Sequence, residues 1–188
     1  WMSNWLYAAK LPTSPWRGAM TLPRELQLRE MDGHAWLCTP VAAEIESAFQ
    51  SGSVIQIQTS HDLSQALANS QGRCRLTLTA DAATSWALQL SNAQGDIWRL
   101  HYNPETRQFG VDRTMAGQSD FHPEFAACHL APRFAHSSVI HLQVYLDACL
   151  METIADDGLS AITSLSFPSS TWTGIEREGN VDVSLQTL

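Results

Sequence analysis

The sequence predicts an all-β fold, an antiparallel β-sandwich that follows a short linker helix. From residue 53 onward, apolar and polar residues alternate with the period of two that is typical of half-buried strands. Turn signals such as Gln94-Gly95 and Asn103-Pro104 divide this region into short strands. The chain is 44% hydrophobic and 16% charged, so it has enough apolar surface to bury a core.

The first stretch of the chain is rich in aromatic residues. Trp1, Trp5, Tyr7 and Trp16 lie close together, and there is little polar sequence before them. So much aromatic surface is normally covered by other structure. We therefore expect the chain to be a portion of a larger protein.

A hairpin and a helix are predicted next. Asp32-Gly33 is a strong turn signal, so Thr21–Leu28 and His34–Thr39 are expected to pair, with Pro23 at an edge or a bulge. The stretch Val41–Gln50 has apolar residues at helical spacing and is followed by Gly52. It is the expected linker helix.

The strands of the sandwich are expected over several alternating segments. In Arg73–Ala80, the residues Cys74, Leu76 and Leu78 share one face. Similar alternation predicts strands over Ser85–Ser91, Asp96–Asn103, Val139–Leu146, Ser160–Phe167 and Asn180–Leu188.

The charge of the chain argues against two classes of partner. The formal net charge is −8 and the 11 Lys and Arg residues form no stripe, which disfavours nucleic acid and anionic membrane surfaces. The apolar runs are too short to cross a membrane as a helix. A neutral ligand such as a sugar remains compatible with this composition.

The four cysteines are far apart and show no Cys-x-x-Cys spacing, which argues against a structural zinc site. Buried free thiols are the simpler interpretation, and one or two disulfides are the alternative. The cysteines are Cys38, Cys74, Cys128 and Cys149.

Three groups of residues, in chain order, carry a resemblance to a known family. They are Trp1–Ala8 with Pro12–Gly18 and Thr21–Leu26, then Tyr102–Thr106 with Asp112–Thr114, Gly117 and Phe121, and finally Asp147, Glu152, Gly158 and Phe167-Pro168. The chain resembles glycoside hydrolase family 32, the family of invertases, inulinases and levanases. In the third group, Cys149, Leu150 and Ile154 depart from the residues that are more usual there.

The resemblance implies a domain organisation. Residues 1–39 would be the partial last blade of the catalytic β-propeller, residues 40–52 the linker helix, and residues 53–188 the C-terminal β-sandwich. The full enzyme would be an exo-acting β-fructosidase of the levanase or inulinase type that is secreted or periplasmic. Its implied partners are the N-terminal propeller and a fructan or sucrose-type sugar; no cofactor or metal is implied, and a homo-oligomer is left open.

The resemblance places the catalytic residues outside this chain. Retaining glycosidases use two carboxyl groups about 5 Å apart as nucleophile and acid/base. The family supplies them from Asn-Asp-Pro-Asn-Gly and Glu-Cys motifs, with a third carboxylate in Arg-Asp-Pro, and none of these motifs occurs here. We assign no catalytic residue and expect the chain alone to be inactive. Trp5 is the one implied substrate-binding residue, stacking on the terminal fructose in the full enzyme; the alternative is a propeller core residue.

Other residue groups have simpler interpretations than a reactive site. Asp156-Asp157-Gly158 is predicted to be a hairpin turn rather than a calcium loop. The spacing of His122, His129, His136 and His141 fits no common zinc pattern. The pairs Glu44/Glu46 and Glu176/Glu178 are interpreted as solvated faces.

A fructan-binding module is the alternative function. It would need exposed aromatic side chains on the sandwich, although Trp86 alternates with Leu88 and Leu90 and is expected in the core. The candidates are Trp86, Trp98, Tyr102, Tyr145 and Trp172.

Overall fold

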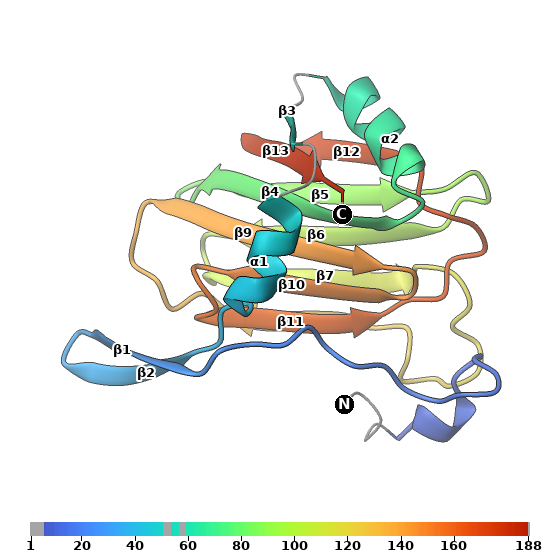
Figure 1. Ribbon diagram of the computed structural model, residues 1–188, viewed down its shortest axis with the longest axis horizontal. Coiled ribbons are helices and arrows are strands. Elements are labelled where there is room, and N and C mark those ends of the chain that lie inside the picture. Colours follow the sequence, from blue (N-terminus) through green and yellow to red (C-terminus); the bar gives the residue numbers. More distant parts are fainter. Residues whose placement is uncertain (1–5, 51–53, 57–58, 188) are drawn as a thin grey trace.

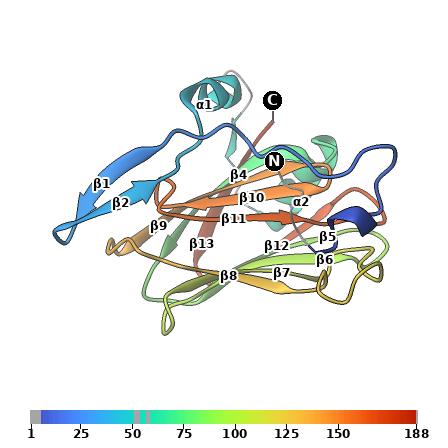
Figure 2. The ribbon, with the colours of Figure 1, turned by 90° about the horizontal axis from the view of Figure 1, so that it is seen from below.

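The computed structural model describes residues 6–50, 54–56 and 59–187, and it confirms the predicted antiparallel sandwich. Figure 2 shows the two sheets stacked as layers. One sheet has the order β11-β10-β9-β4-β13-β3, formed by β3 (Val54–Gln56), β4 (Arg73–Asp81), β9 (Val139–Asp147), β10 (Leu150–Ala155), β11 (Ser160–Leu165) and β13 (Val181–Gln186). The other has the order β12-β5-β6-β7-β8, formed by β5 (Trp86–Ser91), β6 (Ile97–Asn103), β7 (Gln108–Met115), β8 (Cys128–Pro132) and β12 (Gly174–Glu178).

The core lies between the two sheets and follows the predicted alternation. Cys74, Leu76 and Leu78 of β4 are buried in one hydrophobic cluster with Trp86 of the facing sheet. Apolar side chains on alternate positions of both sheets thus meet in a single layer, as is typical of sandwiches.

The predicted hairpin is present but shorter than expected. It consists of β1 (Gln27–Met31) and β2 (His34–Cys38), and both residues of its Asp32-Gly33 turn have positive φ. The strand does not begin at residue 21, because the chain around Pro23 pairs with another segment. The Pro23 carbonyl accepts a hydrogen bond from Ala42 N at 3.0 Å.

Helix α1 (Ala43–Gln50) is the predicted linker helix. Figure 1 shows it in front of the six-stranded sheet, with the β1–β2 hairpin projecting to the lower left. A short 3-10 helix, η1 (Ala8–Lys10), precedes the hairpin.

A second helix, α2 (Ser60–Asn69), was not predicted, because the region after residue 53 was expected to contain strands alone. It begins at a Thr59 cap whose hydroxyl accepts a hydrogen bond from Asp62 N. Its buried residues Leu63, Ala66 and Leu67 have helical rather than strand spacing.

Strand β10 was also missed, and its burial explains why. All six of its residues are buried, so the strand lacks the polar alternation that marks a half-exposed strand. Both faces of β10 must therefore be covered. The strands β7, β8 and β12 were likewise not predicted individually.

Candidate functional site

The outer face of the six-stranded sheet is covered by the segment formed by residues 6–42 and by helix α1. In Figures 1 and 2 this segment passes along β10 and β11 before it turns into the helix. Several of its contacts with the sandwich involve residues that carry the family resemblance. We call this covered surface the docking face.

Glu152 of β10 is the central acid of the docking face. Its side chain is 1% exposed, and it accepts hydrogen bonds from Leu22 N and from Arg24 Nη2, both at 2.6 Å. Arg24 also donates to Thr163 Oγ1 at 3.2 Å. A buried carboxylate with one cation and one backbone N–H as partners fixes the segment at this point, since removing one partner of such a pair is costly.

Arg113 of β7 holds the beginning of the segment. Its buried guanidinium donates to Phe125 O at 2.8 Å, to Leu165 O at 3.1 Å and to the Tyr7 hydroxyl at 2.9 Å. It also lies 4.0 Å from the centre of the Phe125 ring. One side chain thus connects both sheets to Tyr7.

Gly158 marks the third contact, where the β10–β11 turn meets the end of the hairpin. Thr39 N donates to Gly158 O at 2.9 Å. A Cβ atom at Gly158 would lie 2.3 Å from the backbone carbon of Thr39, and its φ is +82°. Both the conformation and the close approach therefore require glycine.

The turn Asp156-Asp157-Gly158 is a hairpin turn, as predicted, but Asp156 is not solvated. It is buried and accepts a hydrogen bond from Arg133 Nε at 2.7 Å. This ion pair tethers the turn to the residues that follow β8.

Glu44 and Glu46 were predicted to form a solvated face. The prediction is correct for Glu44, which is exposed, and wrong for Glu46. Glu46 is half-buried beneath α1, forms an ion pair with Arg75 and accepts a hydrogen bond from the Tyr145 hydroxyl. Burial, together with Glu46, raises the pKa of Tyr145 above its ordinary range. Phe49 packs on the Tyr145 ring at 5.5 Å, so α1 is held by both polar and aromatic contacts.

The aromatic platform considered for sugar binding is absent, because all five candidates are buried. The interpretation of Trp86 as a core residue is confirmed. The exposed fractions of Trp86, Trp98, Tyr102, Tyr145 and Trp172 are 3%, 0%, 2%, 5% and 1%.

The histidines and cysteines show no reactive grouping among the described residues. No three His, Cys, Asp or Glu side chains there are placed to hold a metal ion. All four cysteines are free thiols, but only Cys38 and Cys74 are buried, and Cys128 is exposed. Burial raises the pKa of the Cys74 thiol to about 11, which keeps it protonated at neutral pH.

The outward side of the N-terminal segment is apolar and bare. On the hairpin, Trp36 faces the sandwich and packs on Phe134 at 4.7 Å, whereas the cross-strand pair Leu28 and Leu37 is exposed. Six large apolar residues are exposed along the segment, namely Leu6, Trp16, Met20, Leu26, Leu28 and Leu37. Trp5, the predicted substrate-binding residue, lies outside the described residues.

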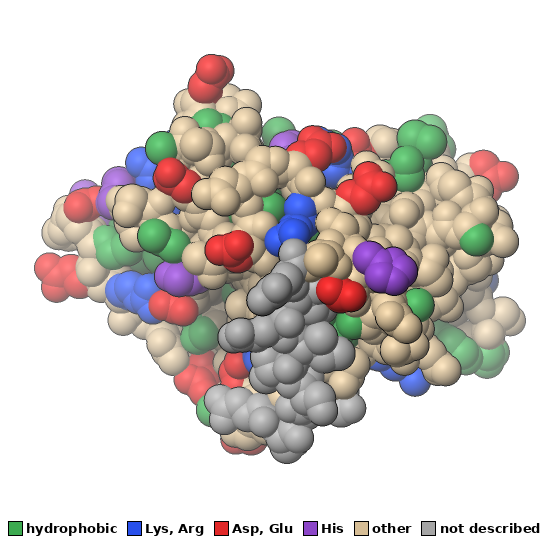
Figure 3. Space-filling model, turned by 90° about the horizontal axis from the view of Figure 1, so that it is seen from above, with side chains coloured by type: hydrophobic (Ala, Val, Ile, Leu, Met, Phe, Trp, Pro, Cys, Tyr) green, Lys and Arg blue, Asp and Glu red, His purple; other side chains and the backbone are tan. Residues whose placement is uncertain are grey.

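Charged side chains are dispersed over the remaining surface. Figure 3 shows acidic side chains spread over one face, with Lys and Arg side chains dispersed rather than gathered into a stripe on the part that the structure describes. No helix of the described residues is long and apolar enough to cross a membrane.

The family model described as glycosyl hydrolases family 32 C terminal matches residues 44–187. The chain belongs to this family. Levanase from Bacillus subtilis is 28% identical over the whole of this family 32 chain, and an extracellular exo-inulinase from Aspergillus awamori is 29% identical over 90% of it. The crystal structure of the Aspergillus awamori exo-inulinase superposes with a TM-score of 0.76 at 25% identity over 99% of the chain.

This family 32 chain spans only part of its relatives, 29% of the levanase and 33% of the exo-inulinase. It is the C-terminal domain of levanase- and inulinase-like enzymes of the family. The resemblance residues Glu152 and Gly158 lie at the docking face, a location that the sequence did not predict.

Proposed function

We propose that this chain is the non-catalytic C-terminal part of a fructan β-fructosidase, and that its sandwich holds the last part of the catalytic propeller in place. The propeller would precede this chain and supply the two carboxylates of a retaining mechanism, with one as nucleophile and one as acid/base. The names of the relatives, levanase and exo-inulinase, support fructan as the substrate class.

The observation that carries this proposal is the two-sided nature of the N-terminal segment. Its inner side is fixed to the sandwich by Glu152, Arg113 and Gly158. Its outer side exposes leucines, including Leu28 at 78% and Leu37 at 57%. Apolar side chains displayed in a row on a fixed hairpin are expected to pack against a further layer of protein.

In the proposed arrangement, residues 1–39 belong to the propeller, residues 40–52 to the linker helix and residues 53–188 to the sandwich. Secretion is part of the proposal, because the Aspergillus relatives are extracellular exo-inulinases. The sandwich contributes rigidity rather than chemistry.

A pair of charge substitutions in the longer enzyme tests the propeller contact. The double variant Leu28→Asp and Leu37→Asp should lower the melting temperature and the rate of fructose release from inulin and levan. The matched control is Met115→Asp with Leu130→Asp, two residues of comparable exposure on the five-stranded sheet. Equal stability and activity of the hairpin variant and the control would count against the proposal.

The non-catalytic role has its own test. Purified 188-residue chain should release no fructose from sucrose, inulin or levan. Fructose release that survives repeated purification would overturn this part of the proposal.

Trp5 is proposed to line the fructose pocket of the full enzyme. Replacing it with Ala should lower kcat/KM by about fivefold, since the loss of one stacking contact is worth about 1 kcal/mol. An unchanged kcat/KM would assign Trp5 to the propeller core instead.

A further inference from the structure

The outer face of the five-stranded sheet contains a polar hollow of about 740 Å³. His101 of β6 lines this hollow, and it pairs directly with Ala87 of β5 and Gly110 of β7, which are both buried. Because these two neighbours are small, no long side chain stands directly beside His101 in this row. The volume lies within the range of small-molecule sites.

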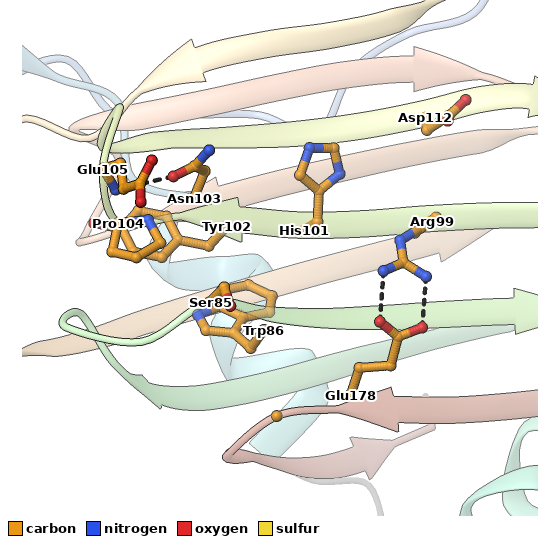
Figure 4. Close-up of a pocket in the computed structure, with 11 residues that line it drawn as sticks. Ser85, Trp86, Arg99, His101, Tyr102, Asn103, Pro104, Glu105, Asp112 and Glu178 are labelled. Carbon is orange, nitrogen blue, oxygen red and sulfur yellow. Dashed lines mark hydrogen bonds and ion pairs between the residues drawn. The ribbon is translucent and has the colours of Figure 1, made fainter.

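In the close-up of Figure 4, the His101 ring points from β6 toward β7, where it lies across Gly110. A Cβ atom at Gly110 would lie 2.2 Å from Cε1 and 2.3 Å from Nε2 of this ring. The imidazole therefore occupies the space that any other side chain at position 110 would need. The missing side chain is what allows a flat ring to form the floor.

His101 is half-buried, and none of the hydrogen bonds between described side chains involves its ring nitrogens. Burial, followed by the charge of Arg99, lowers the pKa of His101, so the ring is neutral at pH 7. A neutral imidazole carries one N–H donor and one acceptor. Both are available to a ligand in the hollow.

A planar charged pair forms one wall. Arg99 Nη1 and Nη2 donate to the two carboxylate oxygens of Glu178, both at 2.6 Å, as the dashed lines of Figure 4 show. These bonds use two of the five N–H donors of a guanidinium. Asp112 lies near the same end of the hollow, and Asn103 and Glu105 lie at the other.

The charges select the class of ligand. The lining holds one guanidinium and three carboxylates, Glu105, Asp112 and Glu178, so an anionic ligand would be repelled. A neutral polyhydroxylated ligand fits, because adjacent hydroxyls can bond to the donors and acceptors of the Arg99–Glu178 pair while a C–H face covers the ring of His101.

We infer that this hollow binds a neutral saccharide, namely a segment of a fructan chain. The choice of fructan rests on the proposed function, whereas the polar recess is a feature of this sheet alone. The site would hold one segment of a polymeric substrate.

Titration of the 188-residue chain, followed by backbone amide NMR, tests the inference. Fructo-oligosaccharides prepared from inulin and from levan should shift the amides of Ala87, His101 and Gly110, with saturation at millimolar concentration. The variant Gly110→Ala should weaken binding by about tenfold, which corresponds to about 1.4 kcal/mol, because it drives the His101 ring out of its place. His61→Ala, an exposed histidine on α2, is the matched control and should bind like the wild type.

Folding of each variant is checked by its thermal unfolding curve. The inference would be overturned if the backbone amides of a folded chain showed no chemical-shift change at about 20 mM oligosaccharide, a concentration high enough to detect weak ligands. It would also be overturned by unchanged binding in both Gly110→Ala and His101→Ala, or by tighter binding of citrate or of a glucan of the same length.

A kinetic measurement separates this inference from the proposed function. In the longer enzyme, Gly110→Ala should raise KM for levan or inulin polymer and leave kcat/KM for sucrose unchanged. The hairpin variant Leu28→Asp with Leu37→Asp should lose sucrose hydrolysis but still bind the polymer normally, because the hairpin takes no part in the saccharide site. Equal effects of Gly110→Ala on sucrose and polymer would contradict the saccharide site.

Discussion

The two outer faces of the sandwich start from similar strands and differ in what covers them. On the six-stranded sheet, Arg75 and Glu152 point outward and are buried under residues 6–42 and α1. On the five-stranded sheet, Arg99 and His101 also point outward, but they line an open hollow. An outward polar residue of a strand can therefore fix a covering segment or remain available to a ligand, and the covering segment decides which.

The two faces should also differ in how much a substitution lowers the stability of the fold. A buried ion pair leaves an uncompensated charge when one partner is removed, whereas an exposed pair is screened by water. Substitutions on the docking face should therefore cost far more stability than substitutions beside the hollow.

The largest effect is expected for Glu152→Ala. It removes the carboxylate that pairs with Arg24 and accepts from Leu22 N, so the free energy of unfolding should fall by about 4 kcal/mol. Urea unfolding measures the change, and limited proteolysis should show earlier cleavage within residues 11–42. The matched control Glu176→Ala removes an exposed acid and should change stability by less than about 0.5 kcal/mol. A similar loss in both variants would refute the contrast.

Gly158→Ala should destabilise more than Gly95→Ala. Both glycines have a φ above +80°, but an alanine Cβ at position 95 meets no atom within 4 Å, whereas at position 158 it would meet Thr39 backbone at 2.3 Å. The conformational cost common to both is about 1 kcal/mol, and the clash adds about 2 kcal/mol more at position 158. Equal melting temperatures of the two variants would show that the turn does not press on the hairpin.

Tyr7→Phe removes the hydroxyl that accepts a hydrogen bond from Arg113. A bond to a charged donor is worth about 2 kcal/mol, so unfolding free energy should fall by this amount. Tyr102→Phe, a substitution at the edge of the hollow, serves as the control and should be nearly neutral. Chemical denaturation of both variants gives the comparison directly.

The smallest effect is a pH dependence at the open face. Burial lowers the folded-state pKa of His101 below its ordinary value of 6.5. The unfolded chain therefore binds a proton at His101 more readily than the folded chain does. The stability that the neutral ring contributes is present above pH 6.5 and is lost as the pH falls through the folded-state pKa. In His101→Gln, the free energy of unfolding should decline less steeply on acidification below pH 6.5. An unchanged slope would place His101 in water rather than in a recess.

Local patterns predicted much of the fold. The alternation of Arg73–Ala80 and of Ser85–Ser91 predicted β4 and β5, and Asp32-Gly33 predicted the hairpin turn. Helix α2 was missed because its apolar residues were interpreted in a region of strand period. β10 was missed because burial on both faces removes alternation.

The candidate sites were less accessible to sequence reasoning. Glu152 and Gly158 were noticed as part of a resemblance, yet their partners were not predictable from spacing. The hollow was missed entirely, since Arg99 and His101 of β6 meet Glu178 of β12 only through strand register, across more than 70 positions of sequence. An alternating His on a strand beside small residues is too common a pattern to indicate a site.

Period-two and helical patterns act between neighbouring residues, so the amino-acid sequence was sufficient to predict two apolar sheet faces that meet and a short helix before them. Which outward polar residues are covered became visible only in the folded chain. Glu152 meets Leu22 across 130 positions of sequence, and Arg113 meets Tyr7 across 106. Such contacts depend on how the segment lies over the finished sheet, and no local rule contains that information.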